Sequence, residues 1–154
     1  MTAALPDIDP YTAATDPIAQ QRHNLLVVDQ FRASGGELTG QFGALPVLLL
    51  TTTGARTGAT RVVPLVYFRD DDRYLVVASK AGAPTNPSWY HNVLAAGRAS
   101  VELGDGRFDV RARIAEGDER DELFAKVAAR FPIYASYQQR TRRRIPIVEL
   151  RRSD

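Results

Sequence analysis

The chain has 154 residues, of which 44% are hydrophobic and 25% are charged, and it carries no cysteine. This composition is typical of one globular domain with a real core, and it excludes disulfides, thiolate nucleophiles and thiolate-bound metals. No apolar run approaches the roughly 20 residues that span a bilayer, and residues 1–17 lack the pattern of a signal peptide, so we expect a cytoplasmic protein.

The N-terminal third is expected to hold one helix and the first strand. We predict residues 1–15 as a flexible arm and residues 16–154 as a single domain. Asp16 and Pro17 are a cap and a first helical residue, and Gly35 is a helix stop. Strands are predicted over 46–53, 61–68 and 74–79. Pro64 lies inside the second of them and indicates an edge, a bulge or a place where a ligand replaces strand pairing.

The second half is expected to alternate helices with a hairpin. A helix capped by Asn86 is predicted to begin at Pro87 and to end near Gly97. Further elements are predicted as a hairpin over 99–103 and 107–115, a helix over 118–131, a short helix over 134–143 and a strand over 145–150. About six mostly antiparallel strands with flanking helices favour an α+β barrel or curled sheet, and no GxGxxG pattern supports a Rossmann sheet.

The turn from Gly54 to Arg61 is a candidate anion site. Gly54 and Gly58 let backbone amides approach a phosphate closely, and Arg56 and Arg61 can pair with its oxygens. The turn is longer than the favoured two-residue hairpins, which suggests a second role. The alternative is a polar turn with solvated arginines.

Two further segments carry candidate ligand contacts. Lys80 can hold an anion, and the Ser79 hydroxyl can bond a reacting oxygen or satisfy the local turn. Trp89 can stack on a ring or pack in the core. Phe131, Tyr134 and Tyr137 share one aromatic surface, which is either helix packing or a lid over a flat substrate.

Arginines gather near the C-terminus, at positions Arg140, Arg142, Arg143, Arg144, Arg151 and Arg152. A solvated face, contact with an anionic ligand tail and peripheral association with an anionic membrane are all left open for this group. The net charge is only +2, and no nucleic-acid-binding signature is present, so nucleic acid is not expected as a partner.

From Pro46 to the last strand, the sequence resembles the actinobacterial deazaflavin-dependent nitroreductases. The resemblance rests on the blocks LLLTTTGARTGATRVVPL, ASKAGAPTNPSWYHN, PIYASYQ and RIPIVEL. It implies a split β-barrel like that of the flavin and pyridoxamine-phosphate oxidases. It also implies a reductase that uses reduced coenzyme F420 as the hydride donor to a small electron-poor acceptor, such as a quinone, nitroaromatic or activated enone, and that has no metal site.

The resemblance also implies roles for individual residues. The cofactor phosphate and acidic tail would be held by Arg56, Thr57, Arg61 and Lys80. The cofactor ring would be lined by Pro64, Ala81 and Trp89. The substrate side would be lined by Ser79, Tyr134 and Tyr137.

The sequence departs from the family pattern at three positions. Ala55 replaces a basic residue of the first turn, and Phe131 replaces a tyrosine. Val66 stands where the family has a tyrosine, and Tyr67 one place on would point to the opposite face of its strand. The overall activity stays plausible with these changes, and the choice of substrate is the property they affect.

Two rival functions remain open on the sequence. One is a protein of the same fold that binds FMN or haem, and the other is a non-catalytic carrier of a deazaflavin or lipid. Either a monomer or a homodimer is compatible with the sequence.

Overall fold

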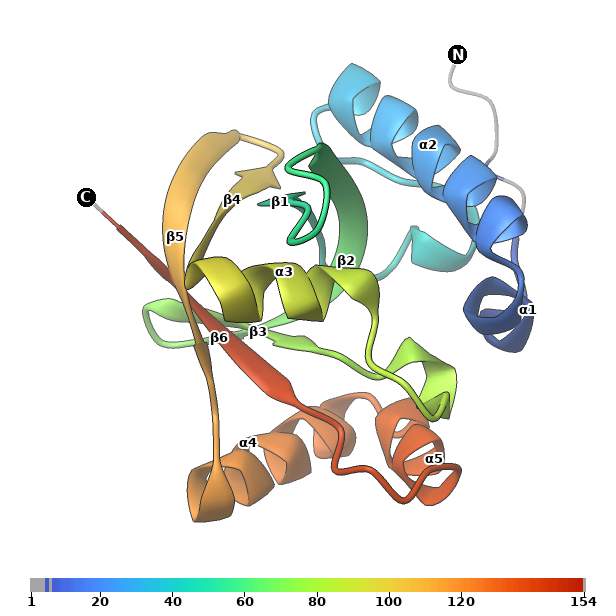
Figure 1. Ribbon diagram of the computed structural model, residues 1–154. Coiled ribbons are helices and arrows are strands. Elements are labelled where there is room, and N and C mark those ends of the chain that lie inside the picture. The colour runs from blue at the N-terminus through green and yellow to red at the C-terminus, as the bar shows by residue number, and fades with distance from the viewer. Residues whose placement is uncertain (1–4, 6, 154) are drawn as a thin grey trace.

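The computed structural model describes residue 5 and residues 7–153, and within them six strands close into a barrel (Figure 1). The strand order is β1-β2-β3-β6-β5-β4, and every neighbouring pair is antiparallel. The strands are β1 Val47–Thr53, β2 Thr60–Asp70, β3 Arg73–Val77, β4 Arg98–Leu103, β5 Gly106–Ile114 and β6 Ile147–Arg152. The predicted α+β barrel of antiparallel strands is confirmed.

Helices flank this barrel on several sides (Figure 1). The α-helices are α1 Pro10–Thr15, α2 Pro17–Ser34, α3 Ser88–Ala96, α4 Gly117–Arg130 and α5 Ile133–Gln139. Two short 3₁₀ turns are η1 Gly40–Phe42 and η2 Lys80–Gly82. None of the helices in this described part of the chain is long and apolar enough to cross a membrane.

The barrel interior is filled by alternate strand residues. Leu48 and Leu50 of β1 are fully buried among side chains of the other strands, because successive strand residues point to opposite faces. Helix α3 adds Trp89 and Val93 to the same core. Burial of one such large apolar side chain stabilises the fold by about 1.5–3 kcal/mol.

The outer faces of the strands pack against helices. Leu49, between two inward leucines, packs against Val28 and Phe31 of α2. On the other side of the barrel, α4 packs Leu123 on the outer face of β3 and β6, in a cluster that includes Leu75. Helices α2 and α4 therefore cover different stretches of the sheet, and α2 lies over β1 and the first half of β2, where Val62 joins its cluster.

Strand β2 changes partner along its length. Its first half, Thr60–Val66, pairs with β1, whereas β3 pairs only with Tyr67–Asp70. Tyr67 donates its amide to the Pro46 carbonyl at 3.0 Å, so the alternation of the ladder turns the backbone of Pro64 away from β1. Within the described residues no strand pairs with that second edge. Of the three predicted reasons for Pro64, the structure shows an edge.

The predicted N-terminal arm contains a helix. Residues 1–4 and 6 lie outside the described part, but Pro10–Thr15 forms α1. Asp9 caps it by accepting the amide of Tyr11 at 2.8 Å and that of Thr12 at 3.2 Å. The ring of Tyr11 packs edge-on against Tyr137, with centroids 6.5 Å apart. The helix was missed although Asp9 and Pro10 are the same local start signal that was recognised at Asp16 and Pro17.

Other boundaries shift for identifiable reasons. Helix α3 begins at Ser88, with Pro87 at its cap position and no side-chain cap. The prediction that Asn86 caps it is wrong, because the Asn86 carboxamide oxygen accepts a hydrogen bond from Arg143 instead. The third strand ends at Val77 rather than at residue 79, where the chain turns into η2.

Candidate functional site

The β1–β2 loop is closed by its own backbone. Gly54 donates its amide to the Ala59 carbonyl at 2.7 Å, and Gly58 donates to the Gly54 carbonyl at 2.9 Å. A Cβ at Gly54 would lie 2.8 Å from the Thr57 hydroxyl, and Gly58 has a left-handed φ of +70°. Both glycines are therefore required by the shape of the loop.

Donors remain on the outside of this loop. Among the described residues, the amides of Arg56 and Thr57 and the guanidinium groups of Arg56 and Arg61 have no hydrogen-bond or ion-pair partner. These groups are exposed. Backbone amides and cations gathered without an acceptor suit an anion such as a phosphate.

Asn92 of α3 anchors the β1–β2 loop by hydrogen bonds, and the sequence analysis did not identify it. Its side chain is 7% exposed, accepts the Ala55 amide at 2.9 Å and donates to the Thr52 hydroxyl at 3.0 Å. An asparagine inside a predicted helix is a disfavoured placement, and that is the one signal the sequence offered, because its burial is visible only in the structure.

The second segment, η2, is strained. Lys80, Ala81 and Gly82 have left-handed φ values of 46°, 53° and 80°. For a non-glycine residue, this conformation costs about 1–3 kcal/mol and persists only where the surroundings enforce it. A Cβ at Gly82 would lie 2.5 Å from the Tyr137 carbonyl oxygen, so η2 sits tightly against α5.

Three predicted residues meet around η2. Ala81, Tyr134 and Tyr137 belong to one cluster, in which the centroids of the two tyrosine rings lie 5.9 Å apart. Ser79 is the residue immediately before η2 in the chain. The Ser79 side chain is 9% exposed and its hydroxyl has no partner among the described residues. The local turn therefore leaves that hydroxyl available to a ligand.

Both phenols of this cluster are neutral at physiological pH. Burial, followed by repulsion from Tyr137, raises the pKa of Tyr134 to about 12. Burial is also the main cause that raises the pKa of Tyr137, with smaller contributions from Tyr11 and Asp9. A neutral phenol donates a hydrogen bond, so the cluster can stabilise negative charge that develops on a bound molecule.

The structure separates other predicted residues. Pro64 pairs with Leu49 on the outer face of β2, and Arg61, three positions earlier, lies on the inner face. A ligand that contacts both must cross the unpaired edge of β2. Tyr67 packs inside the barrel against Tyr74, with ring centroids 5.5 Å apart, so it faces away from Pro64 as expected.

Trp89 packs in the barrel core, where its side chain is 7% exposed. This position agrees with core packing, which was one of the two alternatives for Trp89. Lys80 has one long contact, 3.5 Å from its amine to the Thr85 hydroxyl, and is otherwise available.

Most of the C-terminal arginines are exposed, but they make contacts within the chain. Arg144 pairs with Asp121, Arg151 with Glu149, and the guanidinium of Arg140 lies 3.7 Å from the centre of the Tyr11 ring. The guanidinium of Arg143 donates hydrogen bonds to backbone carbonyls around η2. Among the described residues of this group, only Arg142 makes no contact of these kinds.

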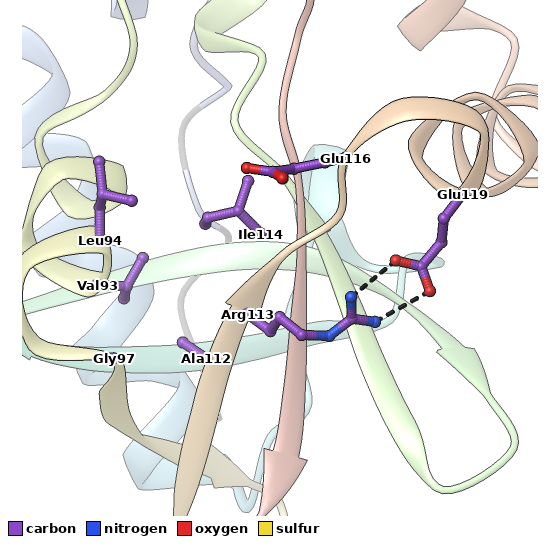
Figure 2. Close-up of a pocket in the computed structure, with 8 residues that line it drawn as sticks. All are labelled: Val93, Leu94, Gly97, Ala112, Arg113, Ile114, Glu116 and Glu119. Carbon is purple, nitrogen blue, oxygen red and sulfur yellow. Dashed lines mark hydrogen bonds and ion pairs between the residues drawn. The ribbon is translucent and has the colours of Figure 1, made fainter.

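Figure 2 shows a hollow of about 540 Å³ between α3, β5 and α4, and none of the predicted site residues lines it. Its arginine, Arg113, is held by two hydrogen bonds to Glu119, at 2.8 and 3.0 Å. The described residues contain no cluster of three or more histidine, aspartate or glutamate side chains that could hold a metal ion.

Comparison with known proteins adds independent information. A family model described as F420H(2)-dependent quinone reductase matches residues 24–151. An F420H(2)-dependent quinone reductase of Mycobacterium tuberculosis is 42% identical over 129 residues, which cover 79% of this chain and 85% of the relative.

Two solved structures are also similar. The F420-H2 dependent reductase FDR-A has a TM-score of 0.62 and 43% identity, over 68% of this chain and 93% of its own. A chain described as a domain-swapped dimer has a TM-score of 0.64 and 36% identity, over 88% of this chain and 98% of its own. The resemblance seen in the sequence and the split-barrel fold are confirmed.

Proposed function

Because the chain belongs to the F420H2-dependent quinone reductase family, we propose that it moves a hydride from reduced coenzyme F420 to an electron-poor acceptor. A quinone is the acceptor that the family name favours, with nitroaromatics and activated enones as further candidates. The reduced deazaflavin, when bound, supplies the hydride, and the protein supplies binding, orientation and electrostatics.

The observation that carries the proposal is the set of donors on the β1–β2 loop that have no partner among the described residues. The amides of Arg56 and Thr57 and the guanidinium groups of Arg56 and Arg61 fit the phosphate and acidic tail of F420. Gly58 keeps the loop in the shape that presents them, and Lys80 adds a cation from η2.

The ring would lie along the unpaired edge of β2. Pro64 carries no amide hydrogen there, and its backbone does not compete for a strand partner. Ala81 has a small side chain on η2, which suits close approach of a flat ring. We leave Trp89 out of this group because its indole is accounted for by the barrel core.

On the acceptor side, we assign Tyr134, Tyr137 and Ser79 to hydrogen bonding. The acceptor gains negative charge as it takes the hydride, and preorganised neutral donors stabilise that charge most where water is excluded. Burial raises the pKa of both phenols, so they stay proton donors even at alkaline pH.

The test is anaerobic oxidation of reduced F420 by the purified protein with a soluble quinone. Recovery of the absorbance of oxidised F420, dependent on both protein and quinone, is the expected result. Tight binding of F420 with no turnover by any acceptor would instead make the protein a carrier. Turnover with FMN in place of F420 would show that FMN is the cofactor.

The acceptor side can be tested with three variants. Ser79→Ala, Tyr134→Phe and Tyr137→Phe each remove one hydroxyl, and we expect kcat to fall roughly 10-fold per lost donor, since one neutral hydrogen bond contributes up to about 1.5 kcal/mol. The F420 dissociation constant should stay unchanged. Tyr67→Phe is the matched control, since that ring lies inside the barrel. Unchanged turnover in all three variants would contradict the assignment.

For assembly we propose a homodimer. The relative described as a domain-swapped dimer covers most of this chain. Helix α2 leaves Ile18, Leu25 and Leu26 between 46% and 64% exposed, which is apolar surface that a second copy can cover. Sedimentation velocity should give a dimer, and a concentration-independent monomer would reject it.

Peripheral membrane association is a proposal with narrower support. The exposed α2 leucines favour it, while most C-terminal arginines are engaged within the chain. Binding to anionic vesicles at low salt would support it, and its absence there would remove it. A cytoplasmic location is likewise proposed.

A further inference from the structure

Arg143 lies between α5 and β6, and its guanidinium reaches across to the segment around η2. Nε donates to the Ala83 carbonyl at 2.8 Å, and Nη2 donates to the Ser79 carbonyl at 2.7 Å. Nη1 donates to the Ala78 carbonyl at 3.1 Å and to the Asn86 side-chain oxygen at 2.7 Å. One planar group thus binds acceptors on both sides of η2.

The segment needs such a partner because it leaves the sheet. The β3–β6 ladder ends at Val77, and beyond it Ala78 donates its amide to the Pro146 carbonyl at 3.0 Å. The carbonyls of Ala78 and Ser79 then turn toward Arg143 just before the left-handed residues of η2. Lysine could not replace this contact, since the rigid fork of arginine alone presents donors in several fixed directions.

The charge of Arg143 is also unusual. Among the described residues it has no carboxylate partner, and its donors meet only carbonyl and carboxamide oxygens. Burial lowers its pKa, although a guanidinium keeps its proton in proteins. A positive charge without a counter-ion therefore lies behind the backbone of Ser79 and Lys80.

We propose that Arg143 is a positioning residue that holds η2 in its strained conformation and keeps an uncompensated positive charge behind it. It aims the Ser79 hydroxyl and the Lys80 amine at the bound anionic cofactor and acceptor. This inference rests on the proposed function for what η2 binds. The conformational part stands on the four hydrogen bonds alone.

The test compares Arg143→Ala, Arg143→Lys and the control Arg142→Ala, which removes an exposed neighbouring arginine. Hydrogen–deuterium exchange of the ligand-free proteins reports on the segment 78–86, and fluorescence titration gives the F420 dissociation constant. We expect Arg143→Ala to speed exchange in 78–86 about 10-fold or more and to weaken F420 binding about 10-fold. Arg143→Lys should recover only part of either property, and Arg142→Ala should match the wild type.

A further readout is chemical rescue. Millimolar guanidinium should restore part of the exchange protection and F420 affinity of Arg143→Ala, and leave Arg142→Ala unchanged. Unchanged exchange in 78–86, or faster exchange spread over the whole barrel, would overturn the proposal that Arg143 holds η2 in place. Faster local exchange with unchanged F420 affinity would overturn its role in binding.

The two proposals fail separately. If the wild-type protein does not bind F420, the proposed function fails. Exchange in 78–86 then still tests whether Arg143 holds η2 in its conformation. If Arg143→Ala does not fold, Arg143→Lys carries the comparison, and wild-type exchange protection in that variant would overturn the inference.

Discussion

Replacing Arg56 and Arg61 together by alanine is expected to weaken F420 binding roughly 100-fold. Each guanidinium can donate charge-assisted hydrogen bonds to a phosphate or carboxylate, and loss of one such contact costs about 1.5 kcal/mol, or roughly tenfold in affinity. Neither group has a partner within the described chain, so neither must leave an existing contact to bind the ligand. Fluorescence titration measures the change.

Salt dependence sharpens this result. The wild-type dissociation constant should rise with ionic strength, and that of the double variant should rise less, because exposed charges are screened. Arg107→Ala is the matched control, since it removes an exposed arginine from the β4–β5 hairpin on another part of the barrel. Equal affinity of the double variant and the wild type would show that the loop is an ordinary turn.

Replacing Glu149 by glutamine is expected to lower the free energy of unfolding by about 3 kcal/mol. The Glu149 side chain on β6 is 3% exposed and accepts hydrogen bonds from Arg73 at 2.7 Å, Arg113 at 2.6 Å and Arg151 at 2.6 Å. Glutamine removes the charge and turns an NH2 group toward the arginine donors, so buried charge-assisted hydrogen bonds worth about 1.5–3 kcal/mol each are lost. The arginines themselves keep other carboxylate partners. Denaturant unfolding measures the loss, with Glu122→Gln, an exposed carboxylate, as control.

The same carboxylate predicts a pH dependence. Burial alone would raise the pKa of Glu149, but hydrogen bonds from Arg113, Arg73 and Arg151 outweigh it and lower the pKa to about 2, from 4.5 when unfolded. A lowered pKa contributes stability that is complete above 4.5 and is lost as the pH falls toward 2. The wild-type melting temperature should therefore fall more steeply over this interval than that of Glu149→Gln. Parallel curves would contradict the assignment.

The strands themselves were accessible from the sequence because alternation and hairpin turns are local, whereas their order in the barrel was not predicted. Leu48 to Leu50 and the proline at position 64 indicated a buried strand and an edge, and both are present. The family resemblance brought the barrel closure, which no local pattern specifies. Helix α1 was missed because it has only six residues, although its Asp9 and Pro10 start was visible, and the contact of Tyr11 with Tyr137 that supports it is long-range.

The candidate site divides in the same way. The β1–β2 loop was recognised because glycines and arginines share one short segment. Asn92 and Arg143 were missed because each supports a segment far away in the sequence. Arg143 looked like one more member of a basic cluster, and only its contacts distinguish it from Arg142. Trp89 packs in the barrel core, as one of its two alternatives expected, and its contact with a cofactor ring stays a prediction.

The central claim is best tested by fluorescence titration of the wild-type protein with F420 and FMN side by side. The account predicts tight, salt-sensitive binding of F420 with little binding of FMN. Preference for FMN would keep the fold and contradict the proposed hydride donor. Binding of neither would contradict the proposed site on the β1–β2 loop and η2.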